Sequence, residues 1–134
     1  MKILILINDA PYGTEKAYNA LRIANQLNKE HSDIEVRIFL MADAANCAIA
    51  NQVTPNGYYN IERMLKLSLN KGAKVKICGS CAEARGLKTL ACLGDVEAPV
   101  ELGLGTLPDE LLQGHAPVGV GGVGFTAHGE PPHE

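Results

Sequence analysis

Two cysteines three residues apart, Cys78 and Cys81, are the side chains of this sequence best suited to covalent chemistry. A cysteine thiolate is a strong nucleophile, and its sulfur exchanges with other sulfurs through mixed-disulfide intermediates. The pair lies in residues 75–86 (VKICGSCAEARG), a pattern that predicts a short apolar strand, a turn and a short helical run. The sequence therefore points to sulfur or disulfide chemistry at this strand–helix junction.

The predicted surroundings of the pair favour the reactive form of the thiol. If the strand ends just before Cys78, a helix from about Ser80 points its N-terminal amides at the sulfur of Cys78 or Cys81. Free amide N–H groups and the helix dipole stabilise a thiolate relative to a thiol. Lys76 and Arg85 would add positive charge. A measured pKa for Cys78 at or above that of free cysteine would contradict this activation.

Three other interpretations of the pair stay open at this point. A zinc site would need four ligands, but Cys47 and Cys92 are isolated, and His115, His128 and His133 lie near the C-terminus. A thioredoxin-like dithiol is suggested by the Cys-x-x-Cys spacing at a helix start. The pair could also be inert and buried, which is the interpretation we favour for Cys47 and Cys92.

Composition restricts the fold and the partners. The chain has 134 residues, 46% hydrophobic and 4% aromatic, with no Trp, which predicts one α/β domain with an aliphatic core. A net charge of −3 without a long basic run argues against a nucleic-acid partner. The apolar run at residues 3–7 is too short for an export signal or a membrane span. We therefore expect a cytoplasmic protein without a membrane partner, whose cysteines are thiols rather than structural disulfides.

Hydrophobic periodicity predicts an alternating order of strands and helices over residues 1–93. Strands are expected at residues 2–7, 34–40 and 75–77, and helices at about 14–27, 42–50 and 61–69. Thr14 is the expected N-cap of the first helix. Parallel strands need crossover connections, so this order predicts a parallel sheet covered by helices. The loops at the carboxyl ends of its strands would form the ligand-binding edge.

The C-terminal part differs from the rest. Residues 1–88 carry a net charge of +4 and residues 89–134 carry −7, and nine of the 14 glycines follow residue 93. We assign residues 1–98 to the domain core and 99–134 to an atypical Gly/Pro-rich segment that completes the domain in part. Residues 90–93 are expected in a connecting segment and 107–112 in one or two helical turns. Residues 117–125 make a poor strand because glycine weakens strand interiors, and 126–134 are expected to be disordered.

Four separated stretches together resemble the DsrE/DsrF family of sulfur-relay proteins, in particular its small YchN-like branch. They are residues 8–13 (NDAPYG), 39–44 (FLMADA), 57–61 (GYYNI), and CGSC at 78–81 with RGL at 85–87. The resemblance implies a three-layer α/β/α fold with a mainly parallel sheet of about five strands (DsrEFH-like). It also implies a cytoplasmic homo-oligomer, a trimer or a hexamer. We expect no cofactor and no metal.

The resemblance assigns the chemistry to Cys78. In the sulfur-transferring members, a cysteine after the third strand carries sulfur as a persulfide between a donor and an acceptor protein, and Cys78 holds the matching position. Cys81 would either expel the bound sulfur by forming a disulfide or only pack. The chain would then be a sulfurtransferase. The alternatives are a non-catalytic oligomeric module that binds a small ligand or a protein, and a dithiol redox protein that uses both cysteines.

Further residues match family positions without an obvious chemical role. Tyr12 and Asp43 follow strands next to the third one, so we predict that they line the cleft of the cysteine, together with Arg85. For Asp43 the alternative is a helix N-cap. For Tyr58 and Asn60 we favour a role in starting a helix and in subunit packing.

Overall fold

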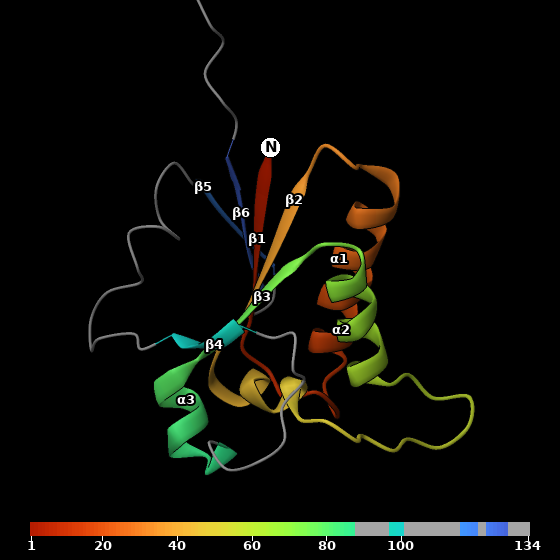
Figure 1. The fold of residues 1–134 in the computed structure, drawn as a ribbon, viewed down its shortest axis with the longest axis vertical. Helices are drawn as coiled ribbons and strands as arrows, with labels where there is room; N and C mark the ends of the chain where they lie inside the picture. Colours follow the sequence, from red (N-terminus) through yellow and green to blue (C-terminus); the bar gives the residue numbers. More distant parts are fainter. Residues whose placement is uncertain (88–96, 101–115, 121–122, 129–134) are drawn as a thin grey trace, which may run out of the picture.

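The computed structural model describes residues 1–87, 97–100, 116–120 and 123–128. Its strands are β1 (Lys2–Ile7), β2 (Glu35–Leu40), β3 (Lys74–Cys78), β4 (Glu97–Val100), β5 (Ala116–Val120) and β6 (Val123–His128). Its helices are α1 (Lys16–Glu30), the 3-10 helix η1 (Ala42–Ala48), α2 (Ile61–Asn70) and α3 (Gly79–Ala84). The strands and helices predicted over the first 87 residues are therefore all present (Figure 1).

The described strands form one mixed sheet in the order β4-β3-β2-β1-β6-β5. Neighbouring strands from β1 to β4 are parallel, whereas β6 runs antiparallel to both β1 and β5. The α/β fold with a parallel sheet is thus confirmed. The expected count of about five strands is not confirmed, because six described strands belong to the sheet and two of them form an antiparallel hairpin at one side.

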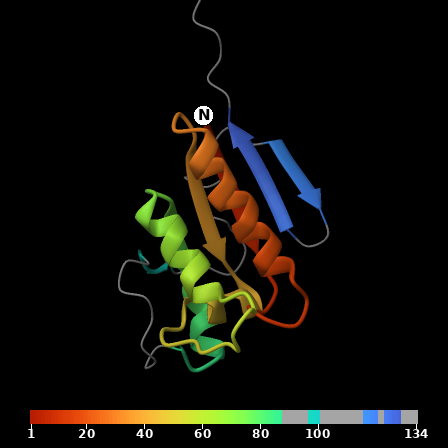
Figure 2. The ribbon, with the colours of Figure 1, turned by 90° about the vertical axis from the view of Figure 1, so that its right-hand side faces the viewer.

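Helices α1 and α2 lie side by side on one face of the sheet (Figures 1 and 2). Alternate strand residues such as Ile5, Ile38 and Val75 project toward them and are fully buried. Burying one such side chain stabilises the fold by roughly 1.5–3 kcal/mol. The predicted stripe of α1 that includes Ala20 and Leu21 faces this core. Within the described residues, no helix combines the length and the apolarity that a membrane crossing requires.

The opposite face of the sheet carries a second, smaller buried cluster. It is formed by Leu4, Phe39 and Cys78, with Leu6 and Met41 packed against it. Cys78 therefore belongs to the face that α1 and α2 do not cover. A helix over this face would complete the three expected layers, but the helical turns predicted at residues 107–112 lie outside the described residues, as does the segment predicted at 90–93.

The hairpin of β5 and β6 corrects the prediction for the C-terminal part. Residues 117–125 were expected to make a poor strand and 126–128 to be disordered, yet β6 pairs with all six residues of β1, from Lys2–His128 to Ile7–Val123. Backbone groups form this ladder, so glycines such as Gly124 can take part. The prediction was wrong because it weighed side chains and ignored the β1 edge, which would otherwise be unpaired. Residues 129–134 lie outside the described residues.

The start of α1 also differs from the prediction. The helix begins at Lys16, and Glu15 before it is in the left-handed conformation, with φ of 60° and no side-chain cap. Thr14 is not the N-cap, because its hydroxyl donates instead to the Asp9 carboxylate at 3.1 Å. The same carboxylate pairs with Lys16 at 2.9 Å. Asp9 thus organises the loop after β1, and Thr14 bonds this carboxylate instead of capping the helix as predicted.

Candidate functional site

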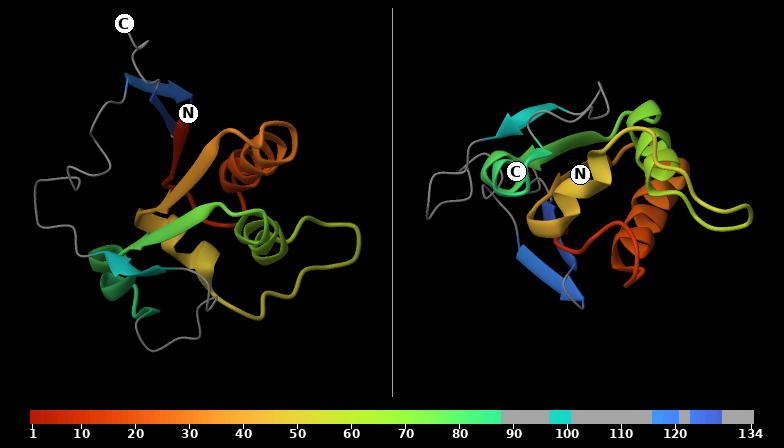
Figure 3. Two further views of the ribbon diagram at one scale, coloured as in Figure 1. Left: turned by 45° about the horizontal axis from the view of Figure 1, so that its top comes forward. Right: turned by 90° about the horizontal axis from the view of Figure 1, so that it is seen from below.

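The carboxyl ends of β1, β2 and β3 lie at one edge of the sheet, where η1 and α3 pack against each other (Figure 3). β3 runs into α3 without a loop, since Cys78 is the last residue of the strand and the N-cap of the helix. η1 follows β2 after one intervening residue, Met41, and begins at Ala42. The short helix expected at residues 42–50 is thus a 3-10 helix that ends at Ala48.

The two cysteines are bonded to each other at this junction. Cys78 and Cys81 form a disulfide with their Cα atoms 5.3 Å apart, within the usual range for such a bridge. The backbone N–H of Cys81 donates to the Cys78 sulfur at 3.3 Å, and the Ser80 hydroxyl oxygen lies 3.4 Å from that sulfur. An amide at the start of α3 therefore points at Cys78, as predicted from the sequence.

The bridge corrects the expectation that all the cysteines are thiols. A strand that leads directly into a helix places residues three apart close together, which brings the sulfurs of Cys78 and Cys81 within bonding reach. The two sulfurs differ in access, because Cys78 is only 2% exposed while Cys81 is partly exposed. In the disulfide form, solvent therefore reaches the pair mainly at Cys81.

Arg85 links the cysteine pair to η1. Its guanidinium donates through Nε and Nη2 to the Asp43 carboxylate, both at 2.9 Å, and through Nη1 to the backbone carbonyl of Cys81 at 3.1 Å. Asp43 is not an N-cap, because that position of η1 belongs to Met41 and the Asp43 side chain reaches across to Arg85. Arg85 thus contacts the pair directly and Asp43 is joined to it through Arg85, while a cleft lined by both stays a prediction. We call Asp43, Cys78, Ser80, Cys81 and Arg85 the cysteine edge.

Tyr12 makes its contacts elsewhere. Its hydroxyl donates to the Gln52 side-chain oxygen at 2.5 Å and accepts the backbone N–H of Ile61 at 3.2 Å. Its ring stacks on that of Tyr59, with centroids 5.7 Å apart. Burial raises the pKa of Tyr12 above its ordinary value. The predicted role of Tyr12 beside the cysteine pair therefore has no support in these contacts, which hold the start of α2 instead.

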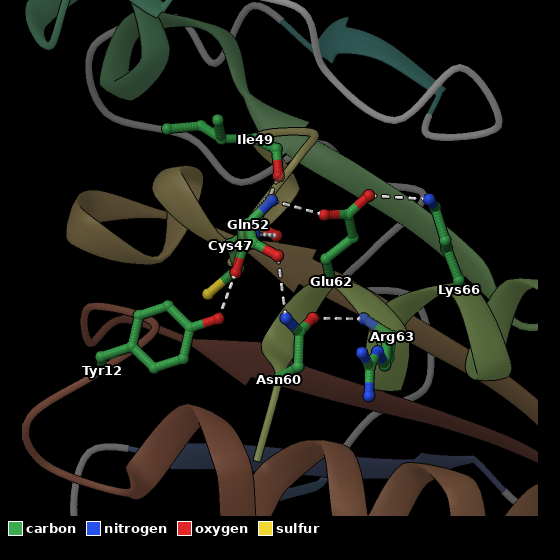
Figure 4. Close-up of polar contacts among 8 residues, drawn as sticks. All are labelled: Tyr12, Cys47, Ile49, Gln52, Asn60, Glu62, Arg63 and Lys66. Atoms are coloured by element: carbon green, nitrogen blue, oxygen red, sulfur yellow. Dashed lines mark hydrogen bonds and ion pairs between the residues drawn. The ribbon is translucent and has the colours of Figure 1, made fainter. Parts of the chain in front are cut away.

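Gln52 is the centre of a polar cluster that the sequence did not reveal (Figure 4). Its side-chain amide donates to the backbone carbonyls of Cys47 at 3.0 Å and Ile49 at 2.8 Å. Its backbone N–H donates to the Glu62 carboxylate at 2.7 Å. These bonds join the end of η1 to the first turn of α2.

Asn60 completes this cluster. Its side-chain oxygen accepts the Arg63 backbone N–H at 2.9 Å, so it is the N-cap of α2, and its amide donates to the Gln52 carbonyl at 3.0 Å. The predicted role of Asn60 at a helix start is confirmed, while Tyr58 is 71% exposed. We call Tyr12, Gln52, Asn60 and Glu62 the loop anchor.

Glu62 is the charged member of the loop anchor. Its carboxylate pairs with Lys66 at 2.7 Å, one turn along α2. The hydrogen bond from Lys66, helped by the N–H of Gln52, lowers the pKa of Glu62. A signal for this arrangement existed in the sequence, because an Asn followed by an acid within the first helical turn is favourable at a helix N-terminus. Nothing in the pattern indicated Gln52.

Cys47 is buried in η1, and its predicted packing role is confirmed. Burial raises its pKa from 9.0 to about 12, which keeps it protonated and unreactive. Cys92, His115 and His133 lie outside the described residues. In the described ranges, no three or more His, Cys, Asp or Glu side chains are grouped so that they could hold a metal ion.

Comparison with known proteins adds to this geometry. The family model described as DsrE/DsrF-like matches residues 1–118. The chain is 40% identical over 96 residues to protein YchN of Escherichia coli K12, covering 72% of this chain and 81% of YchN. It is 26% identical over 87 residues to the sulfurtransferase TusD of Salmonella newport, covering 65% and 68%. The crystal structure of the E. coli ychN protein matches with a TM-score of 0.69 and 35% identity, over 82% of this chain and 87% of that one.

Proposed function

Because the chain belongs to the DsrE/DsrF-like family, we propose that it is a sulfur-relay protein that accepts sulfane sulfur as a persulfide on Cys78. The observation that carries the proposal is the position of Cys78 at the N-cap of α3, where its sulfur accepts the backbone N–H of Cys81. An amide donor to the sulfur stabilises the thiolate, which is the form that attacks. The distant similarity to TusD, named a sulfurtransferase, supports the same chemistry.

The transfer consists of two exchange steps without net oxidation. With the disulfide reduced, the Cys78 thiolate attacks the terminal sulfur of a donor persulfide, so that one S–S bond forms, one breaks, and the donor leaves as a thiolate. An acceptor thiolate then attacks the outer sulfur on Cys78 and takes it away. The Cys81 amide and the Ser80 hydroxyl lie close enough to stabilise the Cys78 thiolate at the start and end of this cycle.

The low exposure of Cys78 suits a cysteine that holds a persulfide for transfer to a partner better than one that exchanges freely with thiols in solution. Cys78 is only 2% exposed, so small thiols in solution, which strip a persulfide, reach it less readily than they would reach an exposed cysteine. A protein donor or acceptor would bind beside the cysteine edge, where Asp43 and Arg85 give exposed charge of both signs.

The partners of the relay would include copies of the chain itself, as a trimer or a hexamer. The segment before α2 presents Val53, 94% exposed, and Tyr58, 71% exposed, while the loop anchor fixes its two ends. An apolar and firmly held segment of this kind suits a contact between subunits. Native mass spectrometry of the protein and of Val53→Asp checks this, and an unchanged oligomeric state in the variant would remove this segment from the interface.

Sulfur loading is tested with a cysteine desulfurase and labelled cysteine. The reduced protein is incubated with both, alkylated, and weighed intact, and we expect a gain of one sulfur atom per chain. Cys78→Ala should abolish the gain, whereas Cys47→Ala should keep it because Cys47 is buried away from the cysteine edge. No added sulfur on any cysteine would contradict the relay and favour the non-catalytic binding module.

The disulfide favours a second candidate, a dithiol redox protein that uses Cys78 and Cys81. This function requires the pair to exchange electrons with a thioredoxin-like partner, and hence a reduction potential of about −270 mV. Equilibration of the protein in dithiol buffers of known potential measures that value. A pair that stays fully reduced at far more oxidising potentials would exclude this candidate.

A further inference from the structure

We propose that Cys81 discharges the sulfur held on Cys78 as hydrosulfide by closing the Cys78–Cys81 disulfide, and that Arg85 positions Cys81 for this step. The inference rests on the proposed function and adds a second fate for the bound sulfur. The sulfur would either go to an acceptor thiolate or leave as sulfide, and Cys81 would decide between them.

The geometry of the pair supports this release. The sulfurs of Cys78 and Cys81 are bonded, and no loop separates β3 from α3 between them. The backbone of this junction therefore holds the two sulfurs within bonding distance. A persulfide lengthens the side chain of Cys78 but leaves its inner sulfur in place. That inner sulfur is therefore the atom within bonding reach of Cys81. Cys47, the other described cysteine, belongs to the core on the opposite face of the sheet.

The step balances with the atoms that are present. The Cys81 thiolate attacks the inner sulfur of the Cys78 persulfide, a new S–S bond forms, and the bond to the outer sulfur breaks. The electron pair of the broken bond leaves with the outer sulfur as hydrosulfide, which takes up the proton that Cys81 lost. One persulfide and one thiol thus give one disulfide and one hydrogen sulfide. Hydrosulfide leaves readily because hydrogen sulfide is a stronger acid than an ordinary thiol.

The pair then needs a dithiol reductant before it can accept sulfur again. The first thiolate of the reductant attacks the sulfur of Cys81, the more exposed residue of the pair, and Cys78 leaves as a thiolate. The N–H of Cys81 stabilises that leaving thiolate at 3.3 Å. The second thiol of the reductant releases Cys81 and becomes oxidised. The supply of dithiol thus resets the site, and the disulfide seen here is the discharged state.

Arg85 holds Cys81 in place for the attack. α3 is six residues long, which is too short to be stable without tertiary contacts. Arg85 supplies such a contact, because one guanidinium bonds both the Cys81 carbonyl and the carboxylate of Asp43 on η1. It fixes the backbone of Cys81 relative to a neighbouring element. Arg85 does not touch the sulfurs in these contacts, so it is a positioning residue.

The test begins with the reduced protein, freed of reductant and loaded with inorganic polysulfide. Samples are alkylated over time and weighed intact, and released sulfide is trapped with a fluorescent bimane and counted. We expect the wild-type persulfide to disappear with one sulfide per disulfide formed. Cys81→Ser should keep its persulfide on Cys78 at least about tenfold longer, since the attacking sulfur is absent. Cys47→Ser is the matched control and should behave like the wild type.

Arg85 is tested in the same assay. Arg85→Gln should slow sulfide release by about tenfold and lower the loading rate much less, because positioning matters for the intramolecular attack. Arg85→Lys should restore only part of the rate, since a single ammonium cannot bridge the carbonyl and the carboxylate as the guanidinium does. A purely structural role would slow loading and release equally and lower the helix content, which circular dichroism measures.

The outcomes separate this inference from the relay itself. If a desulfurase fails to load the protein but polysulfide loads it, the relay is wrong and the release step is still measured. If Cys81→Ser releases sulfide as fast as the wild type, or if the wild-type persulfide persists without disulfide, the release step is overturned. The absence of added sulfur on Cys78 of Cys81→Ser, even from polysulfide, overturns both. Equal release rates in Arg85→Gln and the wild type would remove Arg85 from the proposal.

Discussion

The cysteine edge and the loop anchor share one element, η1, but use it differently. Asp43 near its start bonds Arg85 of the cysteine edge, and the carbonyl of Cys47 near its end accepts a bond from Gln52 of the loop anchor. In the loop anchor, Asn60 and Glu62 are buried, and each bonds fixed backbone N–H groups. In the cysteine edge, the Asp43 side chain is 62% exposed, and the sulfurs sit in a bond that exchange can open.

This difference separates buried polar groups that hold the fold from exposed ones that contribute little to stability. Leaving a buried polar group without its hydrogen-bond partner costs about 1–3 kcal/mol of folding free energy, so substitutions in the loop anchor should destabilise the fold strongly. An exposed ion pair contributes only about 0–1 kcal/mol, so substitutions of Asp43 or Arg85 in the cysteine edge should change the free energy of unfolding little. In the proposed relay its residues act on reactivity, which depends on thiolate stabilisation and access rather than on the free energy of folding.

The sharpest test of the loop anchor is Gln52→Ala, which removes three side-chain hydrogen bonds. The carbonyls of Cys47 and Ile49 and the hydroxyl of Tyr12 would each lose a partner. We expect the free energy of unfolding to fall by about 2–3 kcal/mol, measured by urea denaturation. Gln26→Ala, on the exposed face of α1, is the control and should change it by only about 0.5 kcal/mol. Equal effects of the two substitutions would remove the distinction between the regions.

Asn60 separates the cap from the rest of the loop anchor. Asn60→Ala loses the oxygen that caps α2 and the amide that bonds the Gln52 carbonyl, and should cost about 2 kcal/mol. Asn60→Asp keeps an acceptor for the Arg63 N–H and should cost only about 1 kcal/mol. Thermal unfolding at matched pH compares the two. If Asn60→Asp is as damaging as Asn60→Ala, the bond to Gln52 and not the cap dominates.

Much of the cysteine edge follows from sequence order. Apolar runs and helical periodicity predicted β1, β2 and β3, and neighbouring parallel strands bring their carboxyl ends together, so Asp43 was expected beside Cys78. Arg85 was expected to add positive charge near the pair. The positions of these residues could be anticipated because they depend on topology and on short spacings.

The loop anchor could not be predicted in the same way. Tyr12 leaves the same edge of the sheet as Asp43, but the conformation of its loop directs it toward Tyr59 and Gln52. That conformation includes the left-handed Glu15, for which sequence offers no signal. The β5–β6 hairpin was missed for a related reason, because backbone pairing with β1 does not appear in side-chain patterns.

Cys47 belongs to η1, the element that the two regions share, and its buried thiol should contribute to stability rather than to chemistry. Its pKa is raised from 9.0 to about 12, so the unfolded chain releases this proton first as the pH rises. The free energy of unfolding is therefore unaffected by this thiol below pH 9. Above pH 9 it falls, by about 1 kcal/mol at pH 10, because only the unfolded chain loses the proton. Denaturation of Cys92→Ser at pH 8 and 10, compared with the same variant carrying Cys47→Ala, isolates this loss. An equal pH dependence in both proteins would contradict the burial argument.

The smallest effect is expected for the exposed pair of the cysteine edge. A double-mutant cycle of Asp43→Asn and Arg85→Gln should give a coupling free energy below about 1 kcal/mol, because water screens both groups, and added salt should lower it further. The matched pair is Glu62 with Lys66, in which the Glu62 side chain is only 10% exposed. Glu62→Gln should cost more than Asp43→Asn, since it also weakens the bond from Gln52. A coupling free energy at Asp43 and Arg85 above about 1.5 kcal/mol would mean that the cysteine edge contributes to folding as much as the loop anchor does. The slow sulfide release expected for Arg85→Gln would then follow from lost folding rather than from lost positioning of Cys81.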